Sequence, residues 1–119
     1  MPFVPAPPKP PISLALLSSV DIRVGTIEAV REAPGSKKLL ALTASFGDHK
    51  RTILSAMRSE RPMPEALVGR QTLFVINLEP KAMAGVVSEG MVLDLGYADG
   101  LLPALAFPER PIPDGARAG

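Results

Sequence analysis

The chain lacks cysteine and contains a single histidine among its 119 residues. Without cysteine it can form neither a disulfide nor a catalytic thiolate. A zinc site would need nearly all its ligands from carboxylates, which is a rare ligand set for zinc. The absence of cysteine is typical of cytoplasmic proteins, so we expect a cytoplasmic location. We also expect no bound metal and no other cofactor.

Aromatic residues and long apolar runs are also scarce. Aromatics make up 4% of the chain and hydrophobic residues 46%, so the core of the single expected domain must be mostly aliphatic. No apolar run approaches the roughly 18–20 residues that cross a bilayer. Residues 12–20, ISLALLSSV, faintly resemble a signal peptide, but a proline-rich segment precedes them and no A-x-A cleavage site appears. We therefore expect no insertion into a membrane.

The residue patterns that mark catalytic sites are missing as well. The chain has neither the phosphate-binding pattern G-x-x-x-x-G-K-[ST] nor the G-x-S-x-G context of a serine nucleophile. Its carboxylates are scattered singly, without the spacing of a calcium loop. His49 lies beside an expected turn, and we expect it to be exposed and without a partner. The sequence therefore predicts a binding module and not an enzyme.

The positive charge is concentrated in the middle of the chain. The formal net charge of the whole chain is +1, but residues 31–81 hold nine basic and five acidic residues, a net charge of +4. A local patch of this kind suits contact with phosphates, although a mixed solvated surface would give the same count. Charge alone therefore does not distinguish nucleic-acid binding from an ordinary polar surface.

Alternation of apolar and polar residues predicts a β-protein. The strands expected from this pattern span residues 20–30, 39–46, 50–55, 70–77 and 91–95. Between the third and fourth strands, Pro64 and Glu65 suit the start of a short helix, and Gly69 suits its end. Three strands, a helix and two strands is the order of the OB-fold, a small five-stranded Greek-key barrel.

Several single residues carry further expectations about this barrel. Gly25 inside the first strand predicts a β-bulge or a sharp bend. Residues 47–49 should form a hairpin connection between the second and third strands. Phe46 and Phe74 have apolar neighbours, so we expect them to pack in the core and not to stack on nucleic-acid bases.

The two ends of the chain lie outside the barrel pattern. Residues 1–12 are rich in proline and should form an extended, flexible tail, with the folded domain spanning 13–119. Residues 13–19 should form a short helix capped by Ser13, and because this helix is apolar nearly all round it should be buried against something. Residues 98–119 resemble a hairpin-like extension, and together these apolar ends favour additional buried contacts, including contacts between subunits.

Four stretches in the expected order resemble one known family. They are VDIRVGTI, APGSKKLL, RTILSAM and NLEPKAMAGVVSEGM. Together they are similar to the tRNA-binding domain family. That family includes free-standing tRNA-binding proteins, the C-terminal domain of many bacterial methionyl-tRNA synthetases, the endothelial-monocyte-activating polypeptide domain and the CsaA-type export chaperones. The resemblance covers about residues 20–119 and implies an OB-fold, in agreement with the strand order.

The resemblance also implies which residues contact tRNA. The matching positions lie in the loop before the second strand, in the third strand and in the segment 77–91. They are Lys38, Arg51, Ser55, Asn77, Lys81, Ser88, Glu89 and Met91. The chain departs from the family pattern at Ala33, Gly35 and Ala56, and at Glu89, where the family often has glutamine. A carboxylate at this position would repel phosphate, whereas an amide could donate a hydrogen bond to it.

The free-standing members of the family imply a homodimer built from both ends of the chain. The residues that this comparison assigns to the interface are Leu14, Leu16, Leu17, Leu101, Leu102, Leu105 and Phe107. The same members leave two functions open, which are recognition of tRNA by its shape and a CsaA-type chaperone activity on unfolded or precursor polypeptides. The second function would need an exposed apolar groove near Met83, Val86 and Met91. Burial of these methionines in the barrel core is the alternative that we favour.

Overall fold

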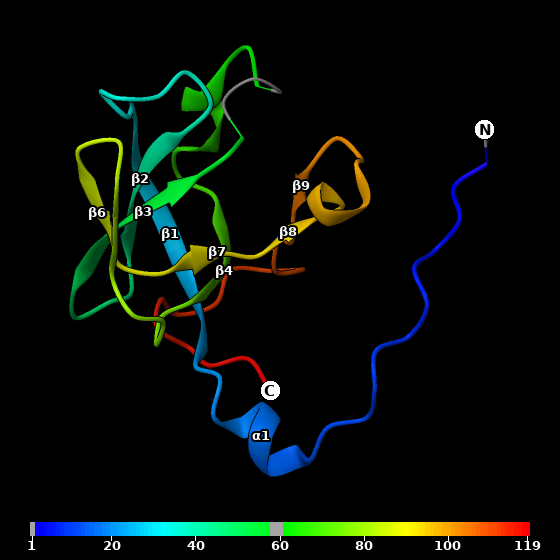
Figure 1. The fold of residues 1–119 in the computed structure, drawn as a ribbon. Helices are drawn as coiled ribbons and strands as arrows, with labels where there is room; N and C mark the ends of the chain where they lie inside the picture. Colours follow the sequence, from blue (N-terminus) through cyan, green and yellow to red (C-terminus); the bar gives the residue numbers. More distant parts are fainter. Residues whose placement is uncertain (1, 58–60) are drawn as a thin grey trace.

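The computed structural model describes residues 2–57 and 61–119, which form one antiparallel barrel with extensions at both ends (Figure 1). The five-stranded sheet has the order β3-β2-β1-β4-β7. Its strands are β1 (Ile22–Glu32), β2 (Leu40–Ser45), β3 (Lys50–Ser55), β4 (Gln71–Val75) and β7 (Met91–Val92). A 3-10 turn, η1 (Pro64–Leu67), lies between β3 and β4, and Pro64 begins it as expected. The OB-fold prediction is therefore confirmed.

The first strand is long because it pairs with different partners along its two halves. Residues 22–26 pair with β4, and residues 26–32 pair with β2. The register with β2 shifts between Ile27 and Ala29, so Glu28 is the extra residue of a bulge. The bulge predicted at Gly25 is thus wrong in position. Gly25 serves a different purpose, because a Cβ atom there would lie 2.8 Å from the ring of Phe46.

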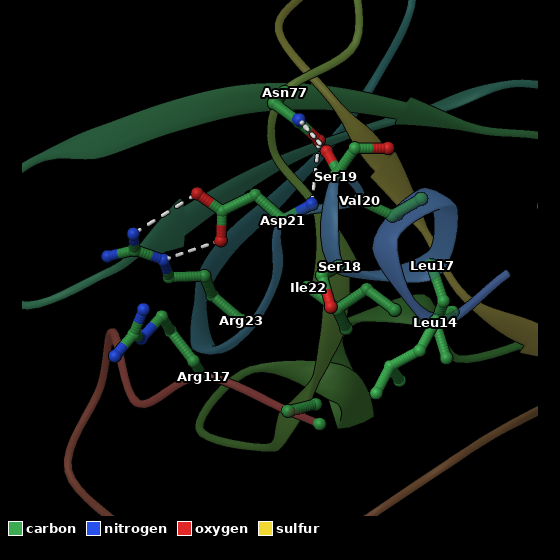
Figure 2. Close-up of a pocket in the computed structure, with 12 residues that line it drawn as sticks. Leu14, Leu17, Ser18, Ser19, Val20, Asp21, Ile22, Arg23, Asn77 and Arg117 are labelled. Atoms are coloured by element: carbon green, nitrogen blue, oxygen red, sulfur yellow. Dashed lines mark hydrogen bonds and ion pairs between the residues drawn. The ribbon is translucent and has the colours of Figure 1, made fainter.

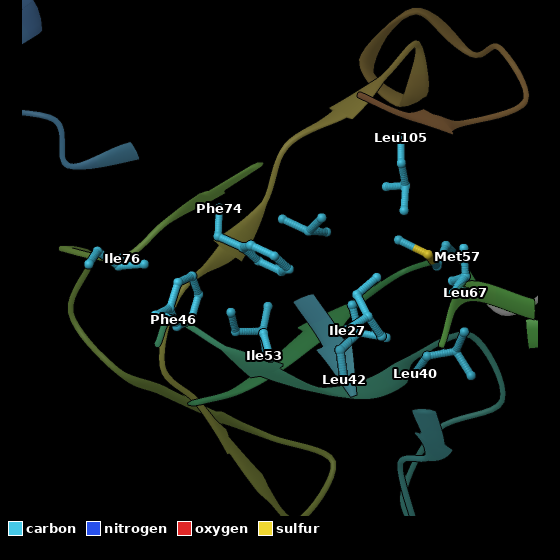
Figure 3. Close-up of a cluster of buried hydrophobic side chains, with 12 residues drawn as sticks. Ile27, Leu40, Leu42, Phe46, Ile53, Met57, Leu67, Phe74, Ile76 and Leu105 are labelled. Atoms are coloured by element: carbon cyan, nitrogen blue, oxygen red, sulfur yellow. The ribbon is translucent and has the colours of Figure 1, made fainter. Parts of the chain in front are cut away.

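The core is mostly aliphatic, and its residues come from every strand of the sheet (Figure 3). Phe46 and Phe74 are both buried and meet edge to face, with ring centroids 5.3 Å apart. The prediction that they pack in the core is confirmed. The buried cluster comprises Ile27, Leu40, Leu42, Ala44, Phe46, Ile53, Met57, Leu67, Phe74, Ile76, Val92 and Leu105.

The segment between β4 and β7 contains a small hairpin of its own. Strands β5 (Lys81–Met83) and β6 (Val86–Ser88) pair with each other and not with the main sheet. The turn between them is Ala84-Gly85, and both residues have positive φ, 52° and 78°. These values match a type I′ turn, whose twist suits a two-residue hairpin.

The C-terminal extension forms a lobe beside the barrel and then returns to it (Figure 1). The lobe, residues 94–107, contains β8 (Asp94–Leu95), the 3-10 turn η2 (Tyr97–Asp99) and β9 (Ala104–Leu105), with β8 paired to β9. The expected fifth strand, 91–95, is therefore divided between β7 and β8. Residues 115–118 then run along the first half of β1, where the N–H of Val24 donates to the carbonyl of Ala116 at 2.9 Å. This last segment completes the barrel.

The helix before the barrel forms as predicted, but its surroundings differ from the expectation. Ser13 caps α1 (Leu14–Ser18) by accepting a hydrogen bond from the N–H of Leu16 at 3.0 Å. None of the residues of α1 is buried within this chain. Its apolar surface therefore lies open in the single chain. None of the helices in the described ranges has the length and apolar character needed to span a membrane.

Candidate nucleic-acid interface

Asn77 connects the end of β4 to the entrance of β1. Its side-chain oxygen accepts a hydrogen bond from the N–H of Asp21 at 2.8 Å, and its side-chain nitrogen donates to the carbonyl of Ser19 at 2.7 Å (Figure 2). Both polar ends of the amide are thereby engaged within the fold. The arrangement gives Asn77 a positioning role, since it fixes the start of the segment 77–91 against α1 and β1.

Ser88 and Glu89 close the barrel at the free edge of β3. The hydroxyl of Ser88 accepts a hydrogen bond from the N–H of Leu54 at 3.0 Å and donates to the carbonyl of Gly90 at 3.1 Å. The N–H of Glu89 donates to the carbonyl of Thr52 at 2.8 Å, and the Glu89 carboxylate accepts from the N–H of Thr52 at 3.1 Å. Side chains therefore replace part of the backbone ladder that would otherwise join this segment to β3. Glu89 is held here by the strand edge.

Arg51 of β3 makes further hydrogen bonds across this junction of the barrel. One terminal nitrogen, Nη1, donates to the carbonyl of Ile76 at 2.8 Å and to that of Glu89 at 3.0 Å. The guanidinium Nε donates to Nε2 of His49 at 3.0 Å, and His49 Nδ1 lies 2.7 Å from the carboxylate of Asp48. His49 must therefore carry its proton on Nδ1 if it accepts from Arg51. The prediction that His49 has no partner is wrong, because its side chain contacts Asp48, its neighbour in the chain, and Arg51, which is two residues further on and so lies on the same face of the extended chain.

A loop that carries two lysines contacts the small hairpin, which begins with a third lysine. The N–H of Gly35, in the loop between β1 and β2, donates to the carbonyl of Ala84 at 3.3 Å. Beneath this contact, Ala33, Ala41 and Leu54 form a second buried cluster that includes Ala84 and Val86 at its margin. The contact fixes the loop that carries Lys37 and Lys38 against the hairpin that begins with Lys81.

Lys38 and Lys81 are both exposed, and within the described ranges the side chain of neither forms a hydrogen bond or ion pair. Lys37, which the family resemblance does not assign, is exposed beside Lys38. The two adjacent lysines in PGSKK are the sequence feature from which Lys37 could have been identified. Ser55 is buried in β3, where it pairs with Leu40 of β2.

The methionines of this region lie on the surface. Met91 is 44% exposed and Met83 36% exposed, and neither belongs to the core cluster. The preferred interpretation, that they fill the barrel core, is therefore wrong. The reason is that Met83 belongs to the separate hairpin, whereas the core side of β7 is occupied by the next residue, Val92. Val87 is also exposed, but its pairing with Ala82 puts it on the opposite face of the hairpin from Met83, which pairs with Val86.

A groove of about 900 Å³ separates α1 from the foot of the barrel (Figure 2). Leu14 and Leu17 line one side, and Asp21, Arg23 and Arg117 line the other. Arg23 binds Asp21 through two hydrogen bonds of 2.9 and 3.1 Å. These hydrogen bonds lower the pKa of Asp21 below its ordinary range, and the positive charge of Arg23 acts in the same direction. The carboxylate therefore stays ionised in all but strongly acidic solution.

The residues assigned to a dimer interface fall into two groups. Leu14, Leu16 and Leu17 of α1 are exposed, as are Leu101, Leu102 and Phe107 of the C-terminal extension. Leu105 differs, because it is only 9% exposed and packs in the core of its own barrel. Its assignment to the interface is replaced by this core position. Arg70 lies over the ring of Phe107, with its guanidinium carbon 5.0 Å from the ring centroid.

No three histidine, aspartate or glutamate side chains gather into a possible metal site within residues 2–57 and 61–119. The groups of this region that could contact a partner are instead three exposed lysines, backbone groups and the exposed side chains of Met83, Val87 and Met91. Lysines contact phosphates, and exposed apolar side chains contact those of another polypeptide or the faces of bases.

The five-stranded barrel, its closing segment and the basic loop beside it place the chain among the OB-type binding modules. A sequence profile of the family described as "Putative tRNA binding domain" matches residues 22–117, and the chain belongs to this family. The family assignment made from the four sequence stretches is therefore confirmed.

The solved structures that resemble this chain include a methionyl-tRNA-synthetase-related protein, the chaperone CsaA and p43. A methionyl-tRNA-synthetase-related protein from Pyrococcus horikoshii is 31% identical over 93% of this chain and 100% of its own, with a TM-score of 0.85. The chaperone CsaA from Bacillus anthracis strain Ames is 28% identical over 92% and 100%, with a TM-score of 0.79. The C-terminal domain of Plasmodium vivax p43 is 30% identical over 82% of this chain and 58% of its own, with a TM-score of 0.73.

Proposed function

We propose that the chain is a cytoplasmic, non-catalytic homodimer that binds tRNA by its shape. One observation carries this proposal: the contact between Gly35 and Ala84 holds the loop of Lys37 and Lys38 against the hairpin of Lys81. Three exposed lysines, whose side chains have no partner in the described ranges, thus belong to two segments that contact each other. A rigid set of cations can match the spacing of phosphates on a folded RNA, whereas mobile cations would attract any polyanion.

In this proposal the residues of the site divide into two kinds. Lys38, Lys81 and Met91 contact the RNA. Arg51, Ser55, Asn77, Ser88 and Glu89 hold the barrel edge and the segment 77–91 in the shape that the RNA meets. The buried rings of Phe46 and Phe74 cannot serve as a stacking platform, so phosphate contacts and shape carry recognition.

A homodimer would present two such edges to one tRNA. Engagement of the first edge raises the effective concentration of the second, so the pair binds more tightly than either edge alone. The exposed leucines of α1 and of the lobe supply the apolar surface that such an interface needs. Two of these leucines, Leu14 and Leu17, line the groove between α1 and the barrel.

A tRNA titration at several salt concentrations tests the proposal. We expect Lys38→Ala and Lys81→Ala each to weaken binding, and each to lower the slope of log K against log salt by about 1, because each lysine neutralises one phosphate. Arg110→Ala is the matched control. Arg110 is an exposed cation of the C-terminal extension that is paired with its neighbour Glu109, so its loss should leave the slope unchanged. If the two lysine variants behave like Arg110→Ala, the site is wrong.

Binding of unfolded polypeptides is the second candidate function. It is favoured by the exposure of Met83, Val87 and Met91 and by the likeness to CsaA chaperones. Methionine surfaces adapt to varied apolar partners, and such binding persists at high salt. A titration with an unfolded precursor peptide at low and high salt therefore separates the two functions. Met91→Ser should weaken peptide binding, and an unchanged affinity would remove this candidate.

A further inference from the structure

Hydrogen bonds on both ring nitrogens define the charge of His49, the single histidine of the chain. Arginine nitrogens donate hydrogen bonds and do not accept them, so Nε2 of His49 has no proton where Arg51 Nε lies 3.0 Å from it. The ionised carboxylate of Asp48 only accepts, so Nδ1, which lies 2.7 Å from it, carries the proton. Only the neutral ring forms both bonds. A second proton, on Nε2, would set an N–H group and a positive charge against the Arg51 guanidinium.

The ring of His49 has little freedom to turn away from Arg51. It stacks on the buried ring of Phe46, with the centroids 5.5 Å apart and an angle of 26° between the planes. The N–H of Phe46 donates to the carbonyl of His49 at 2.9 Å, which fixes the backbone at the end of the hairpin connection. Asp48 in addition holds Nδ1. Protonation therefore displaces the side chain of Arg51, which has more rotatable bonds and no ring to hold it.

Arg51 joins the two ends of the segment 77–91 of the candidate interface. Its Nη1 donates to the carbonyl of Ile76, just before this segment, and to that of Glu89, near its end. Nε and Nη1 belong to one planar guanidinium, so a rotation that withdraws Nε from His49 also moves Nη1. Loss of the bond to the ring therefore weakens both carbonyl bonds at the same time.

Two charges of opposite sign compete for the proton of His49. The carboxylate of Asp48 favours the protonated ring, whereas the guanidinium of Arg51 opposes it. The hydrogen bond from His49 lowers the pKa of Asp48 below its ordinary range, and the charge of Arg23 acts in the same direction, so this carboxylate stays ionised near neutral pH. The chain has one histidine and no cysteine. His49 is therefore the side chain of a type that ordinarily changes charge between about pH 5 and 8.

The other charged groups near this pair come from the strands and from the C-terminal extension. Lys50, the next residue along β3, forms an ion pair of 3.0 Å with the bulge residue of β1. The carboxylate of Glu89 accepts from the backbone of β3. Asp21 attracts both Arg51 and Arg117 at the foot of the barrel. The two hydrogen-bonding partners of the ring, which lie closest to it, thus dominate the balance of charge on its proton.

From these contacts we infer that His49 positions Arg51, and through it the segment 77–91, only while its ring is neutral. Uptake of a proton breaks the bond from Arg51 Nε and loosens the two carbonyl bonds of Nη1. Acid thus weakens the hold of β3 on the segment that carries Lys81. The release of Arg51 stands by itself, whereas its effect on RNA binding rests on the proposed function.

The Nε–H signal of Arg51 in ¹⁵N-edited NMR spectra of the full chain tests the release. We expect it to move toward the position of a free arginine between about pH 7.5 and 5.5, with the same midpoint as the ring signals of His49. Asp48→Asn should move this midpoint to lower pH, because the protonated ring loses its carboxylate partner. His49→Gln is the matched control, since its amide oxygen accepts from Arg51 at either pH and the signal should stay. An Arg51 signal that stays constant while the ring titrates overturns the inference, as does a ring that does not titrate in this range.

The tRNA affinity at the same two pH values and constant ionic strength distinguishes the possible failures. On acidification the affinity of the parent chain should fall roughly threefold or more, the effect of losing one hydrogen bond, and that of His49→Gln by less than about twofold. The added positive charge by itself would strengthen binding to a polyanion, so an affinity that is constant or rises in acid overturns the positioning role. A chain that binds no tRNA at either pH, while the Arg51 signal shifts as expected, overturns the proposed function and supports the release of Arg51.

Discussion

At the scale of single residues, Gly25 shows how closely this small barrel is packed. It is buried in β1 facing the ring of Phe46, which in turn meets Phe74 edge to face. The carbonyl of Ser45 lies 3.1 Å from the position a Cβ atom would take, so the backbone of β2 also limits the space. The glycine is required for this close approach of two strands and a ring, and not for an unusual backbone angle.

Gly25→Ala should therefore lower the free energy of unfolding by about 1–3 kcal/mol, the usual cost of overpacking a core. Chemical denaturation of the variant measures this change. In a Phe46→Leu background, where the ring edge is absent, the same substitution should cost less, because the two effects share one contact. Equal costs in the two backgrounds would show that Phe46 does not limit the space at Gly25.

At the scale of elements, the junction between β3 and the segment 88–90 determines whether the sheet becomes a barrel. Two N–H groups of β3 donate to side chains of this segment, and Arg51 adds bonds to two carbonyls. Leu54 is nearly buried, so water cannot easily replace Ser88 as the partner of its N–H group. Removal of that acceptor leaves an unsatisfied buried donor.

Ser88→Ala should lower the free energy of unfolding by about 1–3 kcal/mol, the cost of such a donor. Glu89→Gln is the companion variant, because its amide oxygen can still accept from the N–H of Thr52. Its stability should stay within about 0.5 kcal/mol of the parent. Denaturant titrations of both proteins measure the difference. A comparable loss in Glu89→Gln would mean that the negative charge of Glu89, and not only its acceptor oxygen, contributes to the closure of this edge.

The strands of this fold could be predicted from the sequence, but the junctions between them could not. Alternation along residues 39–46 and 50–55 depends on neighbours one and two residues away, which the sequence displays. Glu28 gives no local sign of a bulge, and Ala84-Gly85 is not the Asn-Gly pair that usually marks a type I′ turn.

The roles of the site residues could not be predicted from the sequence alone either. The family resemblance identifies Arg51, Asn77, Ser88 and Glu89 as positions of interest. Most of their hydrogen bonds join residues 25 to 58 apart in the chain, so only the closed barrel reveals that these groups are engaged internally. The exposure of Lys37 and Lys38, in contrast, could be predicted without knowledge of the fold. Adjacent cations in a proline-glycine loop have few ways to be buried.

At the scale of the whole molecule, the apolar surface is divided between two places. The helix α1 lies at one end of the barrel and the lobe lies beside it, and each exposes leucines. Single exposed leucines are ordinary on a protein surface, but groups of them mark an interaction site. The interface proposed here would cover both groups.

Leu102→Asp tests this interface without disturbing the barrel, since Leu102 is 73% exposed. Sedimentation equilibrium should show a monomer with an unchanged circular dichroism spectrum, because burial of an unpaired carboxylate opposes association. The tRNA affinity should fall as well, by up to about 10²-fold, because the second edge is lost. Val68→Asp, an exposed apolar position beside η1, is the control and should remain dimeric. A dimeric Leu102→Asp variant would place the interface elsewhere.

The closure at β3 also has a bearing on how the protein behaves at high concentration. In the sheet order, β3 is a terminal strand, and terminal strands with free N–H and carbonyl groups recruit strands of other molecules. Ser88 and Glu89 occupy the N–H groups of Leu54 and Thr52, so this strand has fewer groups available for such pairing. The residues that shape the edge proposed to face the RNA thereby also protect it from aggregation by strand addition.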